Sequence, residues 1–472
     1  MIPEVKAAFN SWGRSSLALA LLFAWILIYP MHGILLQGVF GSNAYLLGHI
    51  FSASEGLGLI ASGFLPPGII RSKACIKAAG FMIFVFTILW SVIPQNGLIE
   101  YLICVLLGFS SAFLVLAWAS GFTGNKEPEL TLGAAMALTN VLLGLTGFAY
   151  NILQNWFIFA AILIGLVPIV SALQITRTIP PEEDRSMPKE KKTAGTGFHI
   201  FLGVVSLSAV AYFSGGFWYR AVVPVFYSNW PDLIGIDSFI YASAVFGLAL
   251  YARKKPFYRI GIISLSSLGM GMAISIIDFE ISVALVLSLT FFAAGLGAMD
   301  LFYWLTLNKF SAFLGSRKSF GFGLGLSLFF ITAPGIAMDT GVLNPLLSPI
   351  PSVIGACVLF LISPFLLFLL HPLSTSAPTG DEGLTLTHEP TAAKKTDSLM
   401  EPPQPAFWHS LTSSEKKVYE LIRKGRTDIE ISANLYISRH TVKFHVRNIL
   451  RKAGAPNRKE LLAQLVNNRD QK

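Results

Sequence analysis

Long apolar runs constrain the fold of this chain more than any other feature. Twelve stretches of about 20 residues are dominated by Leu, Ile, Val, Phe, Ala and Gly, and about 20 such residues carry an α-helix across a bilayer. Inside a bilayer every backbone N–H and C=O group must form a hydrogen bond within the protein, which favours helices. The predicted fold class is therefore all-α, a twelve-helix transmembrane bundle. The runs lie near 17–36, 44–65, 74–94, 99–123, 130–150, 153–176, 198–227, 232–251, 258–278, 281–305, 319–338 and 351–370.

A charged segment separates the runs into two groups of six. Residues 177–197 read RTIPPEEDRSMPKEKKTAGTG and contain no apolar run. Six spans, a charged linker and six more spans indicate a 6+6 pseudo-repeat. We expect residues 1–372 to form one twelve-span membrane domain.

The loops between the runs predict its orientation. Lys and Arg occur in the central linker and in the loops after runs 2, 4, 8 and 10, whereas the odd-numbered loops contain neither. Cytoplasmic loops of membrane proteins are enriched in Lys and Arg. The linker and both termini are therefore predicted to be cytoplasmic, with the lipid bilayer as an obligate partner.

This layout resembles the major facilitator superfamily over roughly residues 10–372. That family usually carries a Gly-x-x-x-Asp-Arg type signature in the loop after the second span. Here the region reads SGFLPPGIIRSKACIK, in which Arg71 and Lys73 match in charge but no Asp is present. The resemblance implies the fold. A fold does not by itself determine a function, so the resemblance does not imply transport. The missing Asp of the signature argues against transport.

Three ionisable residues lie deep inside predicted spans. They are Glu55, Arg220 and Asp300, and Arg220 directly follows Trp218 and Tyr219. Charge within a bilayer is costly and is therefore a functional signal by default. These five residues are the candidates for contact with a small effector. An Arg beside aromatic rings suits an aromatic or carboxylate-bearing ligand, through bidentate hydrogen bonds and stacking.

Structural alternatives stay open for these polar residues. Arg220 could instead pair with Asp300 or Glu55 as a buried strut. A glycine pair, Gly215 and Gly216, is the kind of feature that marks a helix break in transporter-like folds. Weaker candidates are explained by helix packing or by solvation near the outer surface; they are His32, His49, Asp237, Asp278 and Asp339.

The C-terminal segment has a different composition. Of the net charge of +9, residues 409–472 contribute +8, with 14 Lys and Arg against 6 Asp and Glu. Such a balance is what binding to a phosphate backbone requires. Residues 373–407 are rich in Pro, Ser and Thr and have no apolar period. We expect them to form a flexible cytoplasmic tether whose mean reach is about 30–35 Å.

Residues 408–472 carry the start signals of four short helices. Thr412 with Glu415, Thr427 with Glu430, and Asn457 with Glu460 have the spacing of capping boxes, in which side chains satisfy unpaired amides. Ser438 is the predicted cap of the third helix. Gly425 and Gly454 lie where left-handed caps end helices. Helical spacing predicts that the core contains Val418, Leu421, Ile422, Ile431, Leu435, Val442, Val446 and Ile449.

The third of these helices, residues 438–452, is the predicted DNA reader. Lys443 and Arg447 share one face with Phe444 beside them, and Lys and Arg read guanine in a major groove while apolar groups meet thymine methyls. A second set suits phosphate contact or helix packing. That second set contains Arg439, Thr441, His445 and Lys452, with His440 beside them.

These residues closely resemble the LuxR-type helix-turn-helix over about 56 residues. Small departures are Ser432, where Ala is usual, and Ile429, where a polar residue is usual. The matching positions are Leu411, Thr412, Glu415, Val418, Leu421, Gly425, Glu430, Ile431, Leu435, Ile437, Ser438, Thr441, Val442, Lys443, His445, Val446, Ile449, Leu450, Lys452, Asn457, Arg458, Glu460 and Leu461.

The resemblance implies what the domain does. In that family the third helix reads double-stranded DNA and the fourth pairs two domains, which implies a homodimer on DNA with Leu461, Leu462 and Leu465 in or under the contact. The whole chain resembles bacterial membrane-anchored LuxR-type regulators, which implies the cytoplasmic (inner) membrane. We therefore expect a one-component regulator controlled by a small molecule that its membrane domain senses.

Other classes of function remain as alternatives or are excluded by the residues. A transporter that also reports its substrate is the first alternative, and a DNA-binding protein with an inert anchor is the second. No catalytic triad, phosphate loop or metal-ligand spacing is evident, and the three cysteines lie within apolar runs. The chain is therefore not expected to be an enzyme, and no cofactor or metal is predicted.

Overall fold

The computed structural model describes most of two regions of the chain. In the first region it describes residues 13–31, 33–92, 97–179, 194–275 and 282–342, with four residues between 355 and 361. In the second it describes 407–461 except 409–410, 424–425, 429, 432–438 and 459. The chain divides into two compact units, Met1–Thr379 and Gly380–Lys472.

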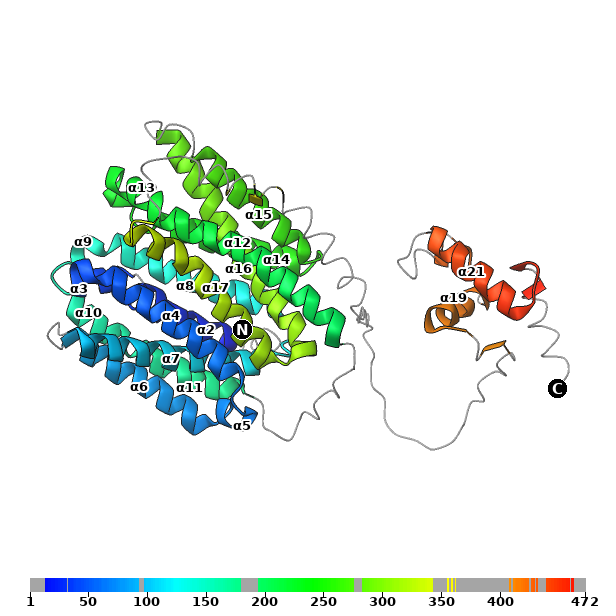
Figure 1. Ribbon diagram of the computed structural model, residues 1–472, viewed down its shortest axis with the longest axis horizontal. Helices are drawn as coiled ribbons and strands as arrows, with labels where there is room; N and C mark the ends of the chain where they lie inside the picture. The colour runs from blue at the N-terminus through cyan, green and yellow to red at the C-terminus, as the bar shows by residue number, and fades with distance from the viewer. Residues whose placement is uncertain are drawn as a thin grey trace, which may run out of the picture. The chain divides into compact units, whose positions relative to one another are not determined.

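Helices joined by short turns build the described part of the N-terminal unit (Figure 1). Its first half contains α2 (Arg14–Ile28), α3 (Ile34–Phe40), α4 (Ala44–Gly63), α5 (Pro67–Ile70), α6 (Lys73–Val92), α7 (Leu98–Phe122), α8 (Pro128–Phe148), α9 (Tyr150–Leu153), α10 (Phe157–Ile164) and α11 (Val167–Thr178). Its second half contains α12 (Ala194–Ala221), α13 (Val223–Asn229), α14 (Ile236–Ala252), α15 (Tyr258–Ile274), α16 (Ser282–Leu314) and α17 (Ser316–Asp339). The described residues contain no strand, and the all-α prediction is confirmed.

Most of the predicted spans correspond to single helices. Nine helical segments of the described residues are long and apolar enough to cross a membrane. The shorter apolar helices α2 and α15 occupy the places of predicted spans 1 and 9. The predicted span 351–370 lies outside the described residues except for Gly355, Val358, Leu359 and Leu361. The count of twelve therefore stays a prediction.

Proline and glycine set several boundaries that the apolar runs alone did not show. The predicted run 17–36 is divided between α2 and α3, with Pro30 between them. The predicted run 153–176 is divided between α10 and α11 near Gly165, with Pro168 in the first turn of α11. Proline lacks the amide hydrogen that a helix interior needs, so helices end before it or begin with it.

The expected break at Gly215–Gly216 is wrong, because α12 continues through both residues to Ala221. These glycines permit a close approach instead. A Cβ added at Gly216 would lie 1.9 Å from the Ile331 carbonyl oxygen of α17. The pair therefore allows two backbones to touch, as small residues do between helices in membranes.

The two halves meet along α4 with α17 and along α8 with α14. In predicted span order these pairs are 2 with 11 and 5 with 8, which a pseudo-twofold axis interchanges. Small residues bring α4 and α17 together: a Cβ at Gly325 would lie 2.7 Å from the Gly56 oxygen, and one at Gly321 would lie 2.6 Å from the Leu59 oxygen. The interface between the halves is thus closely packed.

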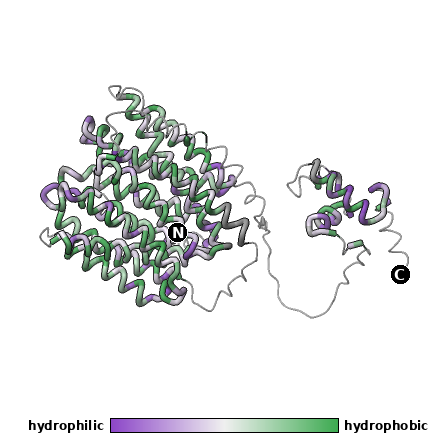
Figure 2. Tube along the Cα trace, viewed as in Figure 1, coloured by the Kyte–Doolittle hydropathy of each residue, from purple (hydrophilic) through white to green (hydrophobic). Residues whose placement is uncertain are grey.

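The C-terminal unit is a small helical domain. Its bounded helices are α19 (Ser413–Arg423) and α21 (Arg439–Ala453), which pack on each other. Hydrophilic and hydrophobic residues alternate along them, whereas hydrophobic residues predominate in the N-terminal unit (Figure 2). The buried core of the domain consists of Leu411, Val418, Tyr419, Ile422, Ile431, Val442, Ile449, Ala455 and Leu461.

Candidate functional site

Reciprocal caps fix the helix starts of the C-terminal unit. The Thr412 amide donates to the Glu415 carboxylate (2.8 Å), and the Glu415 amide donates to the Thr412 hydroxyl (3.3 Å). Thr427 and Glu430 repeat the arrangement at 2.7 and 3.3 Å. These two capping boxes are confirmed.

The third predicted cap is also present. The Glu460 backbone amide donates to Asn457 Oδ1 (3.0 Å), and the side-chain Nδ2 of Asn457 donates to Glu460 Oε1 (3.2 Å). Gly454 has a φ of 63°, so the predicted left-handed cap after the third helix is confirmed. Ser438 and Gly425 lie outside the described residues.

Glu415 also ties α19 to the third helix. Its carboxylate accepts a hydrogen bond from Lys452 Nζ (2.7 Å), and its side chain is only 5% exposed. Burial raises the pKa of Glu415, but the hydrogen bonds from Lys452 and Thr412 outweigh burial, and the pKa lies below its usual range. The carboxylate therefore favours the folded domain.

The two faces of α21 have different environments. Val442 and Ile449 are fully buried and Val446 packs against them, which confirms the predicted core face. Lys443 and Arg447 are exposed on α21, and half of the Phe444 surface is exposed. Two cations and an aromatic ring are therefore exposed on one helix, as contact with a DNA groove requires.

The remaining candidates on α21 are placed less uniformly. Arg439 and Thr441 belong to its first turn, and their side chains lie outside the described residues. His445 is half-buried beside Phe444, with ring centroids 5.9 Å apart. Lys452 donates a hydrogen bond to Glu415. This contact agrees with the second of the two roles predicted for Lys452, helix packing rather than phosphate contact.

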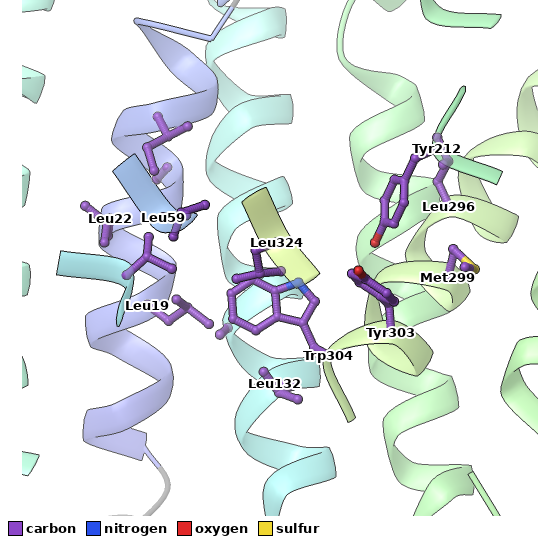
Figure 3. Packing of buried hydrophobic residues seen from close by; sticks show 14 of the residues in the cluster. Leu19, Leu22, Leu59, Leu132, Tyr212, Leu296, Met299, Tyr303, Trp304 and Leu324 are labelled. Atoms are coloured by element: carbon purple, nitrogen blue, oxygen red, sulfur yellow. The ribbon is translucent and has the colours of Figure 1, made fainter. Parts of the chain in front are cut away.

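In the N-terminal unit, a cavity of about 170 Å³ lies between the two halves. Figure 3 shows Trp304 between Leu19 and Leu59 on one side and Tyr212 on the other. The cavity is lined mainly by apolar side chains of both halves. The lining residues are Leu19, Phe23, Ile26, Leu27, Met31, Glu55, Leu59, Val115, Ala135, Met136, Thr139, Asn140, Tyr212, Tyr241, Asp300, Trp304, Leu324, Ser327, Leu328 and Ile331.

Two of the predicted ligand candidates, Glu55 and Asp300, line this cavity together. Tyr212 of α12 donates a hydrogen bond to Asp300 Oδ1 (2.7 Å), and Tyr241 of α14 donates to Oδ2. Glu55, on α4 of the other half, is only 3% exposed. Because the two carboxyl groups come from different halves, one bound molecule can contact both halves.

The other three candidates lie elsewhere. Trp218 is fully buried, stacks on Phe292 with centroids 4.4 Å apart, and donates to the Ser288 hydroxyl. Tyr219 packs edge-on against Trp218. None of Trp218, Tyr219 and Arg220 is among the described residues that line the cavity. The five candidates therefore do not form one site.

Arg220 pairs with Asp339 rather than with Asp300 or Glu55, which corrects the expected strut. Arg220 Nη2 lies 2.5 Å from Asp339 Oδ1, and His49 Nε2 lies 2.9 Å from Asp339 Oδ2. The Arg220 guanidinium also lies over the Tyr45 ring, 4.3 Å from its centroid. Since His49 and Tyr45 belong to α4, this cluster joins the two halves at the end of α17.

The expectation that Asp237 is simply solvated is wrong, and Asp339 is exposed as expected but also forms ion pairs. Asp339 is held by two partners, and Asp237 is 7% exposed and accepts a hydrogen bond from the Tyr227 hydroxyl. Solvation was inferred from their positions near the ends of predicted spans; neighbouring helices cover Asp237, whereas Asp339 stays exposed. Asp278 and His32 lie outside the described residues.

The sequence reasoning missed several cavity residues. Tyr212, Tyr241 and Asn140 carry no charge, so they did not stand out within their apolar runs. Their signal was a polar group in the middle of a predicted span. Burial of such a group demands a hydrogen-bonding partner.

The comparisons with known proteins agree with both parts of this description. The model of "Bacterial regulatory proteins, luxR family" matches residues 409–464. The chain is 36% identical over 56 residues to the spore germination protein GerE of Bacillus subtilis (strain 168), covering 12% of this chain and 76% of that protein. It is 41% identical over 49 residues to the probable transcriptional regulatory protein SgaR of Hyphomicrobium methylovorum, covering 10% of this chain and 23% of that protein.

The N-terminal unit has the fold of a transporter. A crystal structure of the peptide transporter POT, solved as a point mutant, superposes with a TM-score of 0.53 at 13% identity, covering 76% of this chain and 95% of that chain. This likeness shows the fold alone, and it agrees with the major facilitator-like layout. The described residues of the N-terminal unit include nine helical segments that are long and apolar enough to cross a membrane, and the unit is a membrane domain. Through residues 409–464 the chain belongs to the luxR family of bacterial regulatory proteins.

Proposed function

We propose that this protein is a membrane-bound transcription regulator whose DNA binding is controlled by a small molecule in the N-terminal unit. One observation carries the proposal. A luxR-type DNA-binding domain shares its chain with a membrane domain that has a cavity between its two halves. A protein that only needed an anchor would require one span and no internal cavity lined by carboxyl groups.

The topology follows from the distribution of charge. The Lys and Arg of the linker and even-numbered loops favour the cytoplasmic side, which puts the C-terminal domain where DNA is. The lipid bilayer is then the inner membrane of a bacterium. The segment 373–407 acts as a tether with a mean reach of about 30–35 Å, so that the DNA reader clears the bilayer.

DNA reading is assigned to one face of α21. Lys443 and Arg447 contact base edges, with Phe444 against an apolar base surface. Arg439, Thr441 and His445 contact the phosphate backbone and set the register. Two copies bind paired half-sites through the residues that follow Leu461, which itself is buried in the domain core.

Control requires that the ligand bind two states of the membrane domain with different affinity. Glu55 of one half and Asp300 of the other line the cavity, so a ligand that contacts both favours the state in which the halves close around it. The Arg220–Asp339–His49 cluster also joins the halves, and it opens or closes with them. The change in the membrane domain then alters how two tethered DNA domains pair.

Expression profiling tests this proposal. Cells with the full-length protein, with Lys443→Ala plus Arg447→Ala, with Asp300→Asn and without the protein are exposed to a panel of small ring compounds of both charge signs. With the unmodified protein we expect a compound-dependent change of expression at a few promoters. The Lys443→Ala plus Arg447→Ala variant should no longer regulate these promoters. The Asp300→Asn variant should still regulate them but should not respond to the compound. Asp237→Asn is the matched control, because it removes another Tyr-bonded carboxylate that lies outside the cavity.

A compound-independent change of expression would contradict ligand control and leave a DNA-binding protein with an inert anchor. The second candidate function is a transporter that also reports its substrate, and the transporter fold favours it. The missing Asp in the loop after the second span argues against it. Saturable uptake of the inducing compound by vesicles that contain the intact protein would support transport.

A further inference from the structure

The chemistry of the central cavity points to one charge class of ligand. The described residues that line it include no Lys, Arg or His, but they include two carboxyl groups, Glu55 and Asp300. None of the ion pairs among the described residues involves either group. A carboxylate in a medium of low dielectric constant without a cation is costly, and a bound cation offsets that cost.

Hydrogen-bond acceptors in the cavity are also left unused. The Asn140 amide nitrogen donates to the Met136 carbonyl oxygen (2.9 Å), but Asn140 Oδ1 has no partner among the described residues, although Asn140 is only 8% exposed. Asp300 accepts two tyrosine hydroxyls, yet a carboxylate offers about four lone-pair positions and Asp300 is only partly buried. The cavity thus offers acceptors to a donor-rich ligand.

The rest of the lining fits an apolar body. Phe23 and Trp304 form an edge-to-face pair with centroids 5.5 Å apart, and Leu324 lies beside Trp304 in Figure 3. The cavity volume of about 170 Å³ is comparable to the roughly 150 Å³ cavity that holds benzene in an engineered protein. Aromatic faces also attract organic cations.

We infer that this cavity binds a small organic cation, a single-ring or short-chain ammonium whose charged end meets Asp300 and Glu55 and whose apolar body packs on Trp304. The inference rests on the proposed small-molecule control of the membrane domain and names its ligand class. It replaces the carboxylate-bearing ligand expected from Arg220, because Arg220 is neutralised by Asp339 and is not a lining residue.

The test is a charge series on the full-length protein in lipid nanodiscs. Benzylammonium, benzyl alcohol and benzoate share one ring and differ mainly in charge. Binding is followed through tryptophan fluorescence, since Trp304 lines the cavity. We expect saturable binding of benzylammonium, at least tenfold weaker binding of benzyl alcohol and no binding of benzoate.

Variants connect the binding to the cavity. Asp300→Asn is nearly isosteric and should weaken benzylammonium binding at least tenfold, and Glu55→Gln should also weaken it. Asp237→Asn should leave the affinity unchanged. If the cavity variants do not fold, the charge series on the unmodified protein still decides.

Equal or tighter binding of benzoate or benzyl alcohol, or saturation by none of the three, would overturn the inference. Expression profiling separates it from the proposed function. If promoters respond to anionic compounds only, ligand control stands and the cation assignment falls. If benzylammonium binds through Asp300 but no small molecule changes expression, the cavity assignment stands and the sensing role falls.

Discussion

The two units of this chain use helices in opposite ways. In α21 the apolar face packs against the core of the C-terminal unit and the charged face is exposed to water, so the position of a residue on the helix determines its environment. In α7 of the membrane unit, Leu102 and Leu106 are exposed from the protein while Leu107 and Val115 are buried, and all four are apolar. Water sorts the side chains of the C-terminal unit, whereas a bilayer accepts leucine on every face of a helix in the membrane unit.

The first prediction concerns the hydrophobic core of the C-terminal unit. Ile449→Ala removes a fully buried side chain from the C-terminal unit and should cost about 2–5 kcal/mol of its unfolding free energy. Phe444→Ala on the exposed face of the same helix should change it by less than about 0.5 kcal/mol. Chemical unfolding of the C-terminal unit, monitored by limited proteolysis, measures the change in unfolding free energy for both variants. Equal losses would mean that α21 does not have the two faces described.

The second prediction compares a residue exposed to lipid in the membrane unit with a residue exposed to water in the C-terminal unit. Leu106 of α7 is 42% exposed and faces lipid in our account, so Leu106→Lys should cost about 2.5–3.5 kcal/mol of insertion free energy if it lies near the bilayer centre. Phe444→Lys, at a position that is 50% exposed, should leave the fold intact. The yield of inserted, monodisperse protein measures the first, and helical content of the purified chain the second. Normal insertion of Leu106→Lys would place that face of α7 in water.

The third prediction sharpens the assignment of the DNA-reading face. Lys443→Ala or Arg447→Ala in the intact chain should weaken specific DNA binding by roughly 1–3 kcal/mol each if the contact is to a base. Lys416→Ala is the matched control, since Lys416 lies on α19 with its ammonium 5.2 Å from the Trp408 ring. Binding isotherms on a genomic target sequence provide the measurement. An equal loss for all three variants would indicate a general charge effect.

The smallest expected effect is a pH dependence. The pKa of Glu415 is lowered in the folded domain, so its contribution is present above the unfolded value of about 4.3 and is lost as pH falls through the folded value. Glu415→Gln should cost about 1 kcal/mol at pH 7 and reduce the loss of stability between about pH 5 and 3. The lowered pKa of Glu430 adds to the same window and should leave a residual slope. An unchanged slope in Glu415→Gln would remove this contribution.

The difference between the units also explains what the sequence could predict. Capping boxes such as Thr412 with Glu415 are local patterns of three or four residues, so they were found without tertiary information. The core face of α21 followed from helical spacing, because burial and polarity are correlated in a water-soluble domain.

The membrane site could be predicted only in part. Glu55 and Asp300 stood out by their charge, but their convergence on one cavity depends on how apolar helices of the two halves face each other. Arg220 and Asp339 are 119 residues apart, and nothing in either local sequence indicates the other. Apolar residues occur on all sides of these helices, so periodicity carried little information about which face meets which neighbour.

Genome-wide DNA occupancy of the full-length protein tests the central claim most directly. The unmodified chain, the Lys443→Ala plus Arg447→Ala variant and Asp300→Asn are compared with and without an inducing compound. We predict discrete sites with paired half-sites for the unmodified chain, loss of those sites in the first variant, and sites that no longer respond to the compound in the second. Discrete sites that respond to the compound equally in Asp300→Asn, or persist without Lys443 and Arg447, would contradict the account.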